Sequence, residues 1–481
     1  MPDGEMGLGH NHQDPDQLGD QQGQGQTRND DNDDQGMAPP PPAPGDATIP
    51  LDYVTFVNGL PSGFVAAFQA DAPGGIPWSP LVLADTTFDA ATLTAPTALF
   101  TDFTAPQAQP LVLTGDNPVG LINDSTAPLT VVDNATPYQY VATGMGGMTL
   151  FAESANGSFV AEGGSNVVVT GQTQVSAWSF DLLGGNNQVW ANDGNDTIQT
   201  AAGSTNLIAF GSGNDIAASG GTDLFIGGSG NDTIFATGSN DSVLGGSGNM
   251  TFINTNTTPD SQSDLIFGGS GTLDVVGGLG SVTVVGGSGG GLIFGGAAGN
   301  NELVGGAGPA TLVGGGTGDL LIAGPTGGDK LVASVGNETL IGASGGNNVL
   351  WGGTGNDVMV MNGGNNTVMG GSSGTDVIWS GSGNNFIGAN AANVMVVAGP
   401  GGNNTVQAGT GMDIFTFVNG QAGGSAVINN FNTATDSINL VGYGAHADTV
   451  ASVGGSTLIT LADKTQIQLV GVTNLPSSAI G

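Results

Sequence analysis

Cysteine is absent from this chain of 481 residues, and Lys and Arg together number only three. Without cysteine, neither a disulfide scaffold nor thiol catalysis is available. The shortage of basic side chains makes nucleic acids and anionic membranes poor partners, because phosphate groups are bound through Lys and Arg that replace condensed counterions. Three histidines, His10, His12 and His446, leave few nitrogen ligands for zinc, copper or iron.

Long apolar runs are also missing. No stretch of 18 or more apolar residues occurs that could span a bilayer. The first residues, MPDGEMGLGHNHQDPDQ, lack the basic region and the apolar region of a Sec-type signal peptide. We therefore expect a soluble protein with no transmembrane segment and no Sec signal.

Acidic residues and glycine dominate what is present. Asp and Glu number 40, the formal net charge is −37, and 89 residues are glycine. Carboxylate and backbone carbonyl oxygens are the ligands that hard cations prefer, so calcium or magnesium is the natural partner of this composition.

The chain before residue 181 divides into two parts. Residues 1–50 are rich in Gln, Asp, Gly and Pro, which bury too little apolar surface to offset the entropy lost on ordering, and they are predicted to form a disordered acidic tail. In this tail, His10 and His12 are either flexible residues or ligands of a metal ion. Residues 51–180 contain short Val, Thr, Phe and Ala runs, such as LDYVTFV at 51–57, without a helical period. They are predicted to be a β-rich region of unknown role.

Residues 181–417 repeat every nine residues. Two segments, Gly227–Phe235 (GGSGNDTIF) and Gly352–Val360 (GGTGNDVMV), match the pattern G-G-x-G-x-D-x-U-x completely, where U is a large apolar residue. Near matches occur at Ala191–Gln199, Phe210–Ala218 and Ala408–Thr416. This region resembles the repeats-in-toxin (RTX) family, also called haemolysin-type calcium-binding repeats.

The repeat predicts an all-β fold, a right-handed parallel β-roll or β-solenoid. Each nonapeptide combines a six-residue Gly-rich turn with a three-residue strand whose eighth position points inward, so Phe225, Ile234, Val243 and Met359 are expected in the core. Two nonapeptides make one revolution, so equivalent residues stack about 18 apart at a strand spacing of roughly 4.8 Å. About 13 revolutions fit between residues 184 and 417 at this spacing.

The resemblance implies that calcium lies between stacked turns, held by sixth-position Asp carboxylates and by backbone carbonyls of the turn glycines. Alternate repeats face opposite edges, so Asp196, Asp215 and Asp232 are expected on one edge and Asp223 and Asp241 on the other. The remaining predicted ligands are Asp357 and Asp376, which share an edge, Asp413, and the turn glycines Gly228, Gly230, Gly353 and Gly355. The alternative is that these Asp residues are solvated turn residues, since Asp is common in turns.

Acidic sixth positions are not continuous along the repeats. Met250 is expected to end the first row, and between 268 and 313 the sixth positions are Leu273, Val282, Gly291 and Ala310, none of which can ligate calcium. We expect a metal-free middle here, with acids returning at Asp357. The amides at Asn348, Asn366 and Asn385 are expected to form a stacked ladder or to act as weak ligands.

Residues 418–481 leave the nonapeptide pattern for alternating apolar strands. They resemble the cap of RTX β-rolls and the C-terminal region that carries the uncleaved type I secretion signal, and a solenoid end needs a cap because it is an unpaired sheet edge. His446 is expected to be a surface residue of this cap.

No catalytic site is predicted. An HExxH zinc motif is absent, and the three G-x-S-x-G matches, which begin at Gly286, Gly342 and Gly370, lie inside the repeats without the strand-elbow-helix context. We therefore expect a secreted, extracellular or cell-surface bacterial protein that binds calcium and has a structural or adhesive role, with cell-surface or matrix components as partners. The alternative is a secreted RTX-type enzyme or toxin whose activity resides in residues 51–180.

Overall fold

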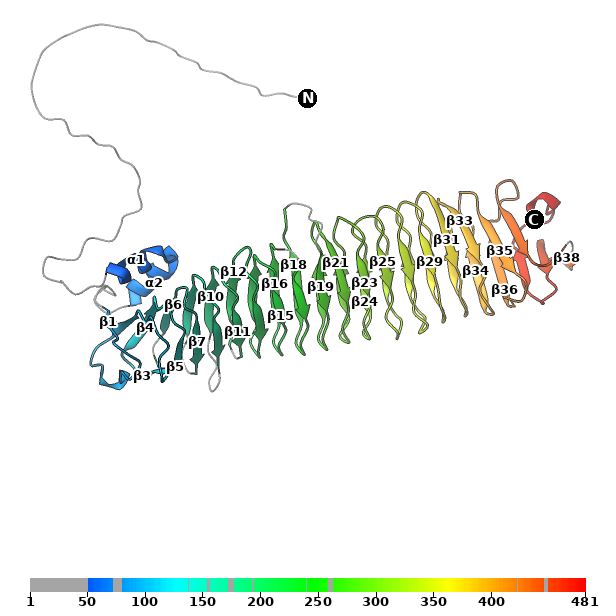
Figure 1. Cartoon of the computed structure of the whole chain (residues 1–481). Helices are drawn as coiled ribbons and strands as arrows, with labels where there is room; N and C mark the ends of the chain where they lie inside the picture. Colours follow the sequence, from blue (N-terminus) through cyan, green and yellow to red (C-terminus); the bar gives the residue numbers. More distant parts are fainter. Residues whose placement is uncertain are drawn as a thin grey trace, which may run out of the picture. The chain divides into compact units, whose positions relative to one another are not determined.

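Residues 81–469 wind into a parallel β-solenoid of about 18 revolutions, here called rungs (Figure 1). The computed structural model describes residues 51–481 except 72–79, 137, 154–155, 172–176, 193, 239, 258–262, 422 and 445–448. The predicted tail of residues 1–50, with His10 and His12, and also His446 lie outside the described residues.

Each rung contributes one strand to each of two sheets, called sheet A and sheet B, so strands two apart in sequence are hydrogen-bonded neighbours. Sheet A contains β1 (Leu81–Val82), β2 (Thr97–Thr101), β4 (Pro118–Asn123), β6 (Gln139–Thr143), β8 (Gly157–Ala161), β10 (Trp178–Leu182), β12 (Thr197–Thr200), β14 (Ile216–Ser219), β16 (Asp232–Ala236), β18 (Met250–Asn254), β20 (Leu273–Val276), β22 (Gly291–Phe294), β24 (Ala310–Val313), β26 (Lys330–Val332), β28 (Val349–Trp351), β30 (Thr367–Met369), β32 (Phe386–Gly388), β34 (Asn403–Gln407), β36 (Ser425–Asn429), β38 (Thr449–Val453), β39 (Ser456–Thr460) and β40 (Gln466–Leu469). Sheet B contains β3 (Leu111–Gly115), β5 (Leu129–Ala135), β7 (Met148–Ala152), β9 (Val167–Thr170), β11 (Gln188–Ala191), β13 (Leu207–Phe210), β15 (Leu224–Ile226), β17 (Ser242–Leu244), β19 (Ser263–Phe267), β21 (Ser281–Val285), β23 (Glu302–Val304), β25 (Leu320–Ile322), β27 (Thr339–Ile341), β29 (Val358–Val360), β31 (Thr375–Trp379), β33 (Asn393–Val397), β35 (Ile414–Val418) and β37 (Ser437–Val441).

The inward face of each repeat strand carries one large apolar residue. In β16, Ile234 is fully buried and is stacked between Ala217 of β14 and Phe252 of β18. The predicted inward residues Phe225, Val243 and Met359 are also fully buried, so the predicted register is confirmed. The odd-numbered strands from β11 to β35 give thirteen rungs, the number expected from an 18-residue repeat.

The solenoid continues beyond the repeats in both directions. Strands β2 to β10 precede them, and β37 follows them, with the same parallel stacking. Here β4, β6 and β8 are buried on both faces rather than one. Their outer face is covered by α1 (Leu51–Gly59) and α2 (Ser62–Asp71), which lie beside the first strands of sheet A (Figure 1).

The prediction of a strand at 51–57 was wrong, because this segment is the helix α1. The buried residues of α1, of α2 and of the short turn between them recur at helical spacing on one face, where they form a second small core: Tyr53, Phe56, Val57, Leu60, Phe64 and Phe68. The aromatic and β-branched composition of LDYVTFV favours a strand, but burying this stripe against sheet A favours a helix. Two short 3-10 helices, η1 (Ala90–Thr92) and η2 (Ser477–Ala479), complete the described elements.

The C-terminal end of the solenoid closes with antiparallel strands. Strand β40 pairs in parallel with β36, whereas β39 runs antiparallel to β40, and β38 runs antiparallel to β39. The change of direction ends the parallel stacking, and the backbone groups of β36 are paired rather than left as an open sheet edge. No helix in the described part of the chain is long and apolar enough to cross a membrane.

Candidate metal sites in the turns

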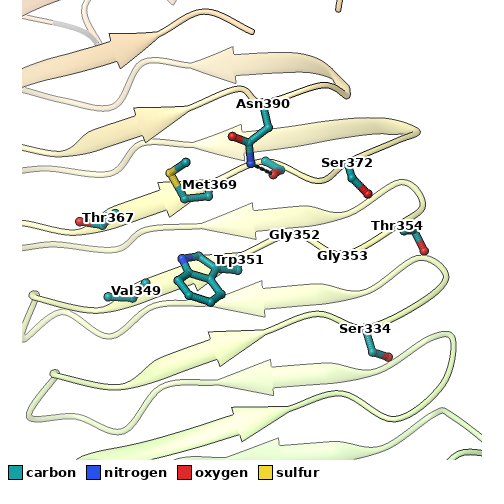
Figure 2. Close-up of a pocket in the computed structure, with 11 residues that line it drawn as sticks. Ser334, Val349, Trp351, Gly352, Gly353, Thr354, Thr367, Met369, Ser372 and Asn390 are labelled. Atoms are coloured by element: carbon teal, nitrogen blue, oxygen red, sulfur yellow. Dashed lines mark hydrogen bonds between the residues drawn. The ribbon is translucent and has the colours of Figure 1, made fainter. Parts of the chain in front are cut away.

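A groove of about 710 Å³ lies on the outer face of sheet A over β28 and β30 (Figure 2). Trp351 is half exposed there, beside hydroxyl groups such as that of Thr354 and the amide of Asn390, which donates to the carbonyl oxygen of Gly370 at 2.5 Å. The residues that line the groove include no Asp, Glu, His or Lys. A groove lined in this way offers no pair of titratable groups for acid-base chemistry.

Most of the buried acids lie in the turns or at the starts of strands instead. Each Asp at the sixth position of a repeat lies just before or at the start of a strand, and its Oδ1 accepts a hydrogen bond from the backbone N–H of the equivalent residue one rung earlier. The N–H of Asp196 donates to Asp215 at 2.8 Å, and that of Asp223 donates to Asp241 at 2.8 Å. These carboxylates therefore form ladders along the solenoid axis.

In several of these acids the second carboxylate oxygen accepts a hydrogen bond from its own turn. The N–H of Gly228 donates to Oδ2 of Asp232 at 3.2 Å, and the N–H of Gly353 donates to Oδ2 of Asp357 at 3.1 Å. The Gly-rich turn folds back so that an N–H four residues earlier reaches the carboxylate. One acid thus links two rungs and holds the shape of its own turn.

The predicted turn glycines are required because the stacked turns approach each other closely. A Cβ added to Gly230 would lie 1.4 Å from the carbonyl oxygen of Gly213 in the previous rung, and one added to Gly228 would lie 1.7 Å from that of Gly211. Gly353 and Gly355 meet carbonyl oxygens of the previous rung at 2.1 and 1.6 Å in the same way. Any side chain at these positions would force the rungs apart.

Burial makes the charged form of these acids costly. It raises the pKa of Asp215 from 3.8 to about 6 and that of Asp241 to about 7. Burial is also the main cause that raises the pKa of Glu338 to about 8, with neighbouring Asp357 and Asp319 adding repulsion. The pKa values of Asp232 and Asp376 are raised by burial too, against the lowering effect of their backbone hydrogen bonds. A row of such groups needs protons or cations to become stable.

The donor atoms fit a hard cation. Oδ2 of Asp215, Oδ2 of Asp241 and Oε2 of Glu338 are buried without a hydrogen-bond partner. Within the described residues no three Asp, Glu or His side chains are grouped closely enough to hold a metal by themselves. A calcium ion in these turns would therefore be held by carboxylates of adjacent rungs together with carbonyl oxygens of the turns, which is an all-oxygen ligand set.

The sixth positions form two rows that run along opposite sides of the solenoid. Edge A consists of the residues at the start of the sheet A strands, namely Asp196, Asp215, Asp232, Met250, Leu273, Gly291, Ala310, Asp329, Asn348, Asn366, Asn385 and Asn404. Edge B consists of those at the start of the sheet B strands, namely Asn166, Asn187, Asn206, Asp223, Asp241, Asp264, Val282, Asn301, Asp319, Glu338, Asp357, Asp376, Val394, Asp413 and Asp436. All the predicted Asp residues lie in these rows, in the predicted grouping, and their role as ligands remains a prediction.

Five buried acids in these rows were not expected from the sequence: Asp264, Asp319, Asp329, Glu338 and Asp436. The expectation that acids return only at Asp357 was therefore wrong. Each of the five lies two residues before a fully buried apolar residue, as Asp319 does before Leu321. The sixth position can be located as the residue two before the inward apolar residue, and this rule would have found all five acids. The glycine pattern did not reveal them, because insertions and substitutions change the glycines of these turns.

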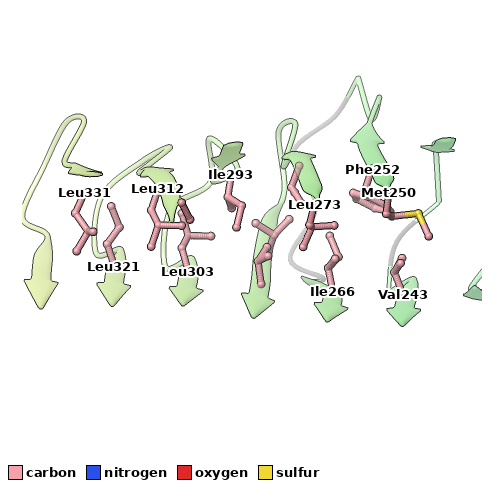
Figure 3. Close-up of a cluster of buried hydrophobic side chains, with 14 of the residues drawn as sticks. Val243, Met250, Phe252, Ile266, Leu273, Ile293, Leu303, Leu312, Leu321 and Leu331 are labelled. Atoms are coloured by element: carbon pink, nitrogen blue, oxygen red, sulfur yellow. The ribbon is translucent and has the colours of Figure 1, made fainter. Parts of the chain in front are cut away.

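Between the acid rows, edge A carries apolar side chains. Met250 and Leu273 point between the sheets and join the core formed by residues such as Phe252, Ile266 and Leu312 (Figure 3). Ala310 is buried in the same row and Val282 in edge B. These turns have no carboxylate at the sixth position, and the apolar core extends into the space that carboxylates occupy elsewhere.

The asparagines of edge A form the expected amide ladder. Nδ2 of Asn348 donates to Oδ1 of Asn366 at 3.3 Å, and Nδ2 of Asn366 donates to Oδ1 of Asn385 at 3.3 Å. The backbone N–H of Asn366 donates to the same oxygen of Asn385 at 3.0 Å. Because each amide both donates and accepts, this row is satisfied without a cation.

A comparison with protein families identifies the repeats. Four copies of the RTX calcium-binding nonapeptide repeat match the chain, at residues 183–217, 218–249, 332–368 and 362–387. Calcium is therefore the cation that these turns bind. No curated protein matches the chain.

Proposed function

We propose that this RTX-repeat protein is exported from a bacterial cell unfolded and folds on calcium outside it into a structural or adhesive component of the cell surface. The observation that carries the proposal is the set of buried acids in the two rows, which recur between Asp196 and Asp436. The chain has only three Lys and Arg residues, which cannot neutralise them. The rows make folding depend on a cation from the surroundings.

The calcium concentration decides where the chain folds. In a cytoplasm poor in calcium, stacked carboxylates such as Asp223 and Asp241 repel each other in a medium of reduced dielectric. The expanded chain suits passage through a narrow exporter. Outside, calcium near the roughly 10⁻⁴ to 10⁻³ M affinities of extracellular modules fills the rows, and the binding free energy becomes folding free energy.

A structural rather than a catalytic role is supported by the regularity of the molecule. The rungs repeat one packing unit along the described solenoid, and the groove over β28 and β30 offers no acid or base. We place the export signal in residues 418–481, where the antiparallel strands β38 to β40 close the solenoid.

Location and export are tested separately. Fractionation of the producing bacterium should find the chain on the cell surface, and a chelator wash should release it. Fusion of residues 418–481 to a cytoplasmic reporter should cause export of the reporter, while fusion of residues 263–421 should not. A chain that stays in the cytoplasm of its own host, or one that remains on the surface after chelation with its β structure intact, would overturn the proposal.

A further inference from the structure

The groove over β28 and β30 results from an interruption in the outward side chains of sheet A. Trp351, Met369 and Gly388 are register neighbours on β28, β30 and β32. Gly388 has no side chain, and a Cβ added to it would lie 2.8 Å from both Sδ and Cε of Met369. The thioether of Met369 therefore lies over Gly388, in the next rung, rather than against Trp351, and the space beside the indole is left open (Figure 2).

Trp351 differs in this respect from Trp379, an exposed indole on sheet B. Trp351 is 51% exposed and Trp379 is 47% exposed. Trp379 lies between Val360 and Val397 in its column, so an apolar side chain flanks it on either side. Single exposed apolar residues are ordinary on soluble proteins, so exposure alone indicates no ligand. The indole of Trp351 borders a space of about 710 Å³, within the range of about 300 to 1,000 Å³ of small-molecule sites.

The polar atoms around this space are uncharged and free to bind a ligand. The hydroxyl groups of Thr354, Thr367 and Ser372 have no hydrogen-bond partner among the described residues. Nδ2 of Asn390 is fixed by the carbonyl oxygen of Gly370, which leaves Oδ1 of the same amide as an acceptor. Each hydroxyl both donates and accepts. The groove therefore presents one aromatic plane beside several neutral hydrogen-bonding groups, a composition typical of ligand sites.

We propose that this groove binds a neutral glycan. The C–H face of a sugar ring packs against an indole, and sugar hydroxyl groups donate to and accept from hydroxyl and amide side chains. An anionic ligand such as a phosphate ester would need Lys or Arg, and the residues that line the groove include neither. Lys330 lies next to Val349 in the preceding rung, outside the lining.

A peptide matches this groove less well than a sugar chain does. An extended peptide gains most of its affinity by pairing its backbone with an open sheet edge. Trp351 and Met369 lie on strands whose backbone groups are already paired with a neighbouring strand on each side. A glycan needs no free sheet edge, because its contacts are made by its ring faces and hydroxyl groups.

Glycan binding rests on the proposed function, because it names the chemical class to which an adhesive surface component would adhere. It is tested on the purified full-length chain, whereas location and export are tested in the producing bacterium. Either can therefore fail without the other.

Calorimetric titration of the full chain in calcium tests the groove with neutral probes: cellohexaose, maltohexaose, mannohexaose and chitohexaose. We expect at least one to bind, and Trp351→Ala to weaken that binding at least about 30-fold, as the loss of a central aromatic contact does. The matched control Trp379→Ala removes a similarly exposed indole from sheet B and should bind as the parent does. Thr354→Val removes one hydroxyl group and should weaken binding about 5-fold.

Gly388→Ala tests the open space itself. Its Cβ must displace the flexible end of Met369, which lies 2.8 Å away, and the displaced thioether should narrow the groove and weaken glycan binding. Circular dichroism in calcium verifies that this variant and the others fold.

Binding of none of the neutral probes, or equal binding by Trp351→Ala and the parent, would overturn the glycan site and leave the proposed function standing. Binding of polygalacturonate alone, or a loss of binding in Lys330→Gln, would show that the ligand is acidic and overturn its assignment as neutral. Binding of an unfolded polypeptide in place of the sugars would assign the groove to protein and overturn the proposal in the same way.

Discussion

Acid-lined turns and apolar turns alternate along one solenoid, and they are held together in different ways. In residues 207–241 the sixth positions are carboxylates, such as Asp215 and Asp241, whose buried Oδ2 atoms have no hydrogen-bond partner. In residues 250–310 the same positions of edge A carry Met250, Leu273 and Ala310, which belong to the apolar core. The backbone stacking is the same in both, so the side chain at one position in nine decides whether a rung depends on an ion.

The comparison shows that the strands and the turns of this fold have separate sources of stability. Inward residues such as Ile234 and Leu312 are fully buried in both regions and supply similar hydrophobic free energy. Only the turns differ. An acid-lined turn adds to the free energy of unfolding when its carboxylates are neutralised by calcium or by protons. The expected effects below are ordered from the largest to the smallest.

Removal of calcium should separate the two regions most strongly. With a chelator, we expect amide hydrogen exchange to become fast in β12 to β19 and in the sheet B strands from β25 to β35, where at least one row is acidic, because repulsion between unneutralised carboxylates opens these rungs. Strands β20 to β24, which have no acid at the sixth position, should retain more protection. Equal loss of protection along the whole solenoid would show that the apolar turns have no stability of their own.

Substitution of a turn glycine should damage an acid-lined rung even when calcium is present. The Cβ of Gly230→Ala would lie 1.4 Å from the carbonyl oxygen of Gly213, so the rungs must separate, at a cost of about 3 kcal/mol in the free energy of unfolding. Urea denaturation in calcium measures the loss. Gly63→Ala in α2 is the control, since its added Cβ meets no atom within 4 Å, and an equal loss there would contradict the argument from close stacking.

Shortening an apolar turn residue should destabilise the solenoid without changing calcium binding. Leu273→Ala removes a side chain that is 1% exposed and should cost about 3 kcal/mol, because a cavity is left in the core. Calorimetric titration should find the calcium stoichiometry of the parent.

In an acid-lined turn, the substitution to compare with Leu273→Ala is Asp241→Asn. The amide keeps an oxygen to accept the N–H of Asp223 but loses the charge, so bound calcium should decrease while the calcium-free stability stays the same or rises. If Asp241→Asn binds as much calcium as the parent, or if Leu273→Ala binds less, the assignment of calcium to the acid rows alone fails.

The calcium-free chain should be most stable in acid. Because the pKa of Asp241 is raised from 3.8 to about 7, the folded chain binds this proton more tightly than the unfolded chain does, and the stabilisation is lost as pH rises through that interval. Glu338, with its pKa raised from 4.5 to about 8, extends the interval upward. Circular dichroism in chelator should show β structure at pH 4.5 that disappears by pH 8, and a spectrum that does not change with pH would contradict this.

The amide ladder of edge A should stabilise its rungs equally with and without calcium. Asn366→Ala leaves the backbone N–H of Asn348 and the Nδ2 of Asn348 without their acceptor and should cost about 1 to 2 kcal/mol in calcium and in chelator alike. Thermal unfolding in both conditions measures this. A loss confined to calcium would indicate that Asn366 is a ligand.

Much of the fold and of the candidate site follows from the nine-residue period alone. The period predicts which residue of each strand is buried, as it does for Phe225 and Met359, and it assigns Asp196 and Asp223 to opposite edges because successive repeats enter opposite sheets. These are consequences of local geometry, since each repeat contributes one turn and one strand whatever its neighbours are. For the same reason, the apolar sixth positions from Leu273 to Ala310 could be excluded as ligands.

Tertiary packing decided the rest. Tyr53 and Phe56 became helical because the outer face of β4 and β6 offers apolar surface that only a helical stripe covers, and nothing in the repeat pattern marks that face. Asp264 and Glu338 joined the rows because stacking on neighbouring rungs restores the register after insertions and substitutions that conceal it in the sequence. The period can be read from nine consecutive residues. The register of a strand and the covering of a sheet face by helices depend instead on contacts with residues in the next rung or further away, at least about 18 residues along the chain.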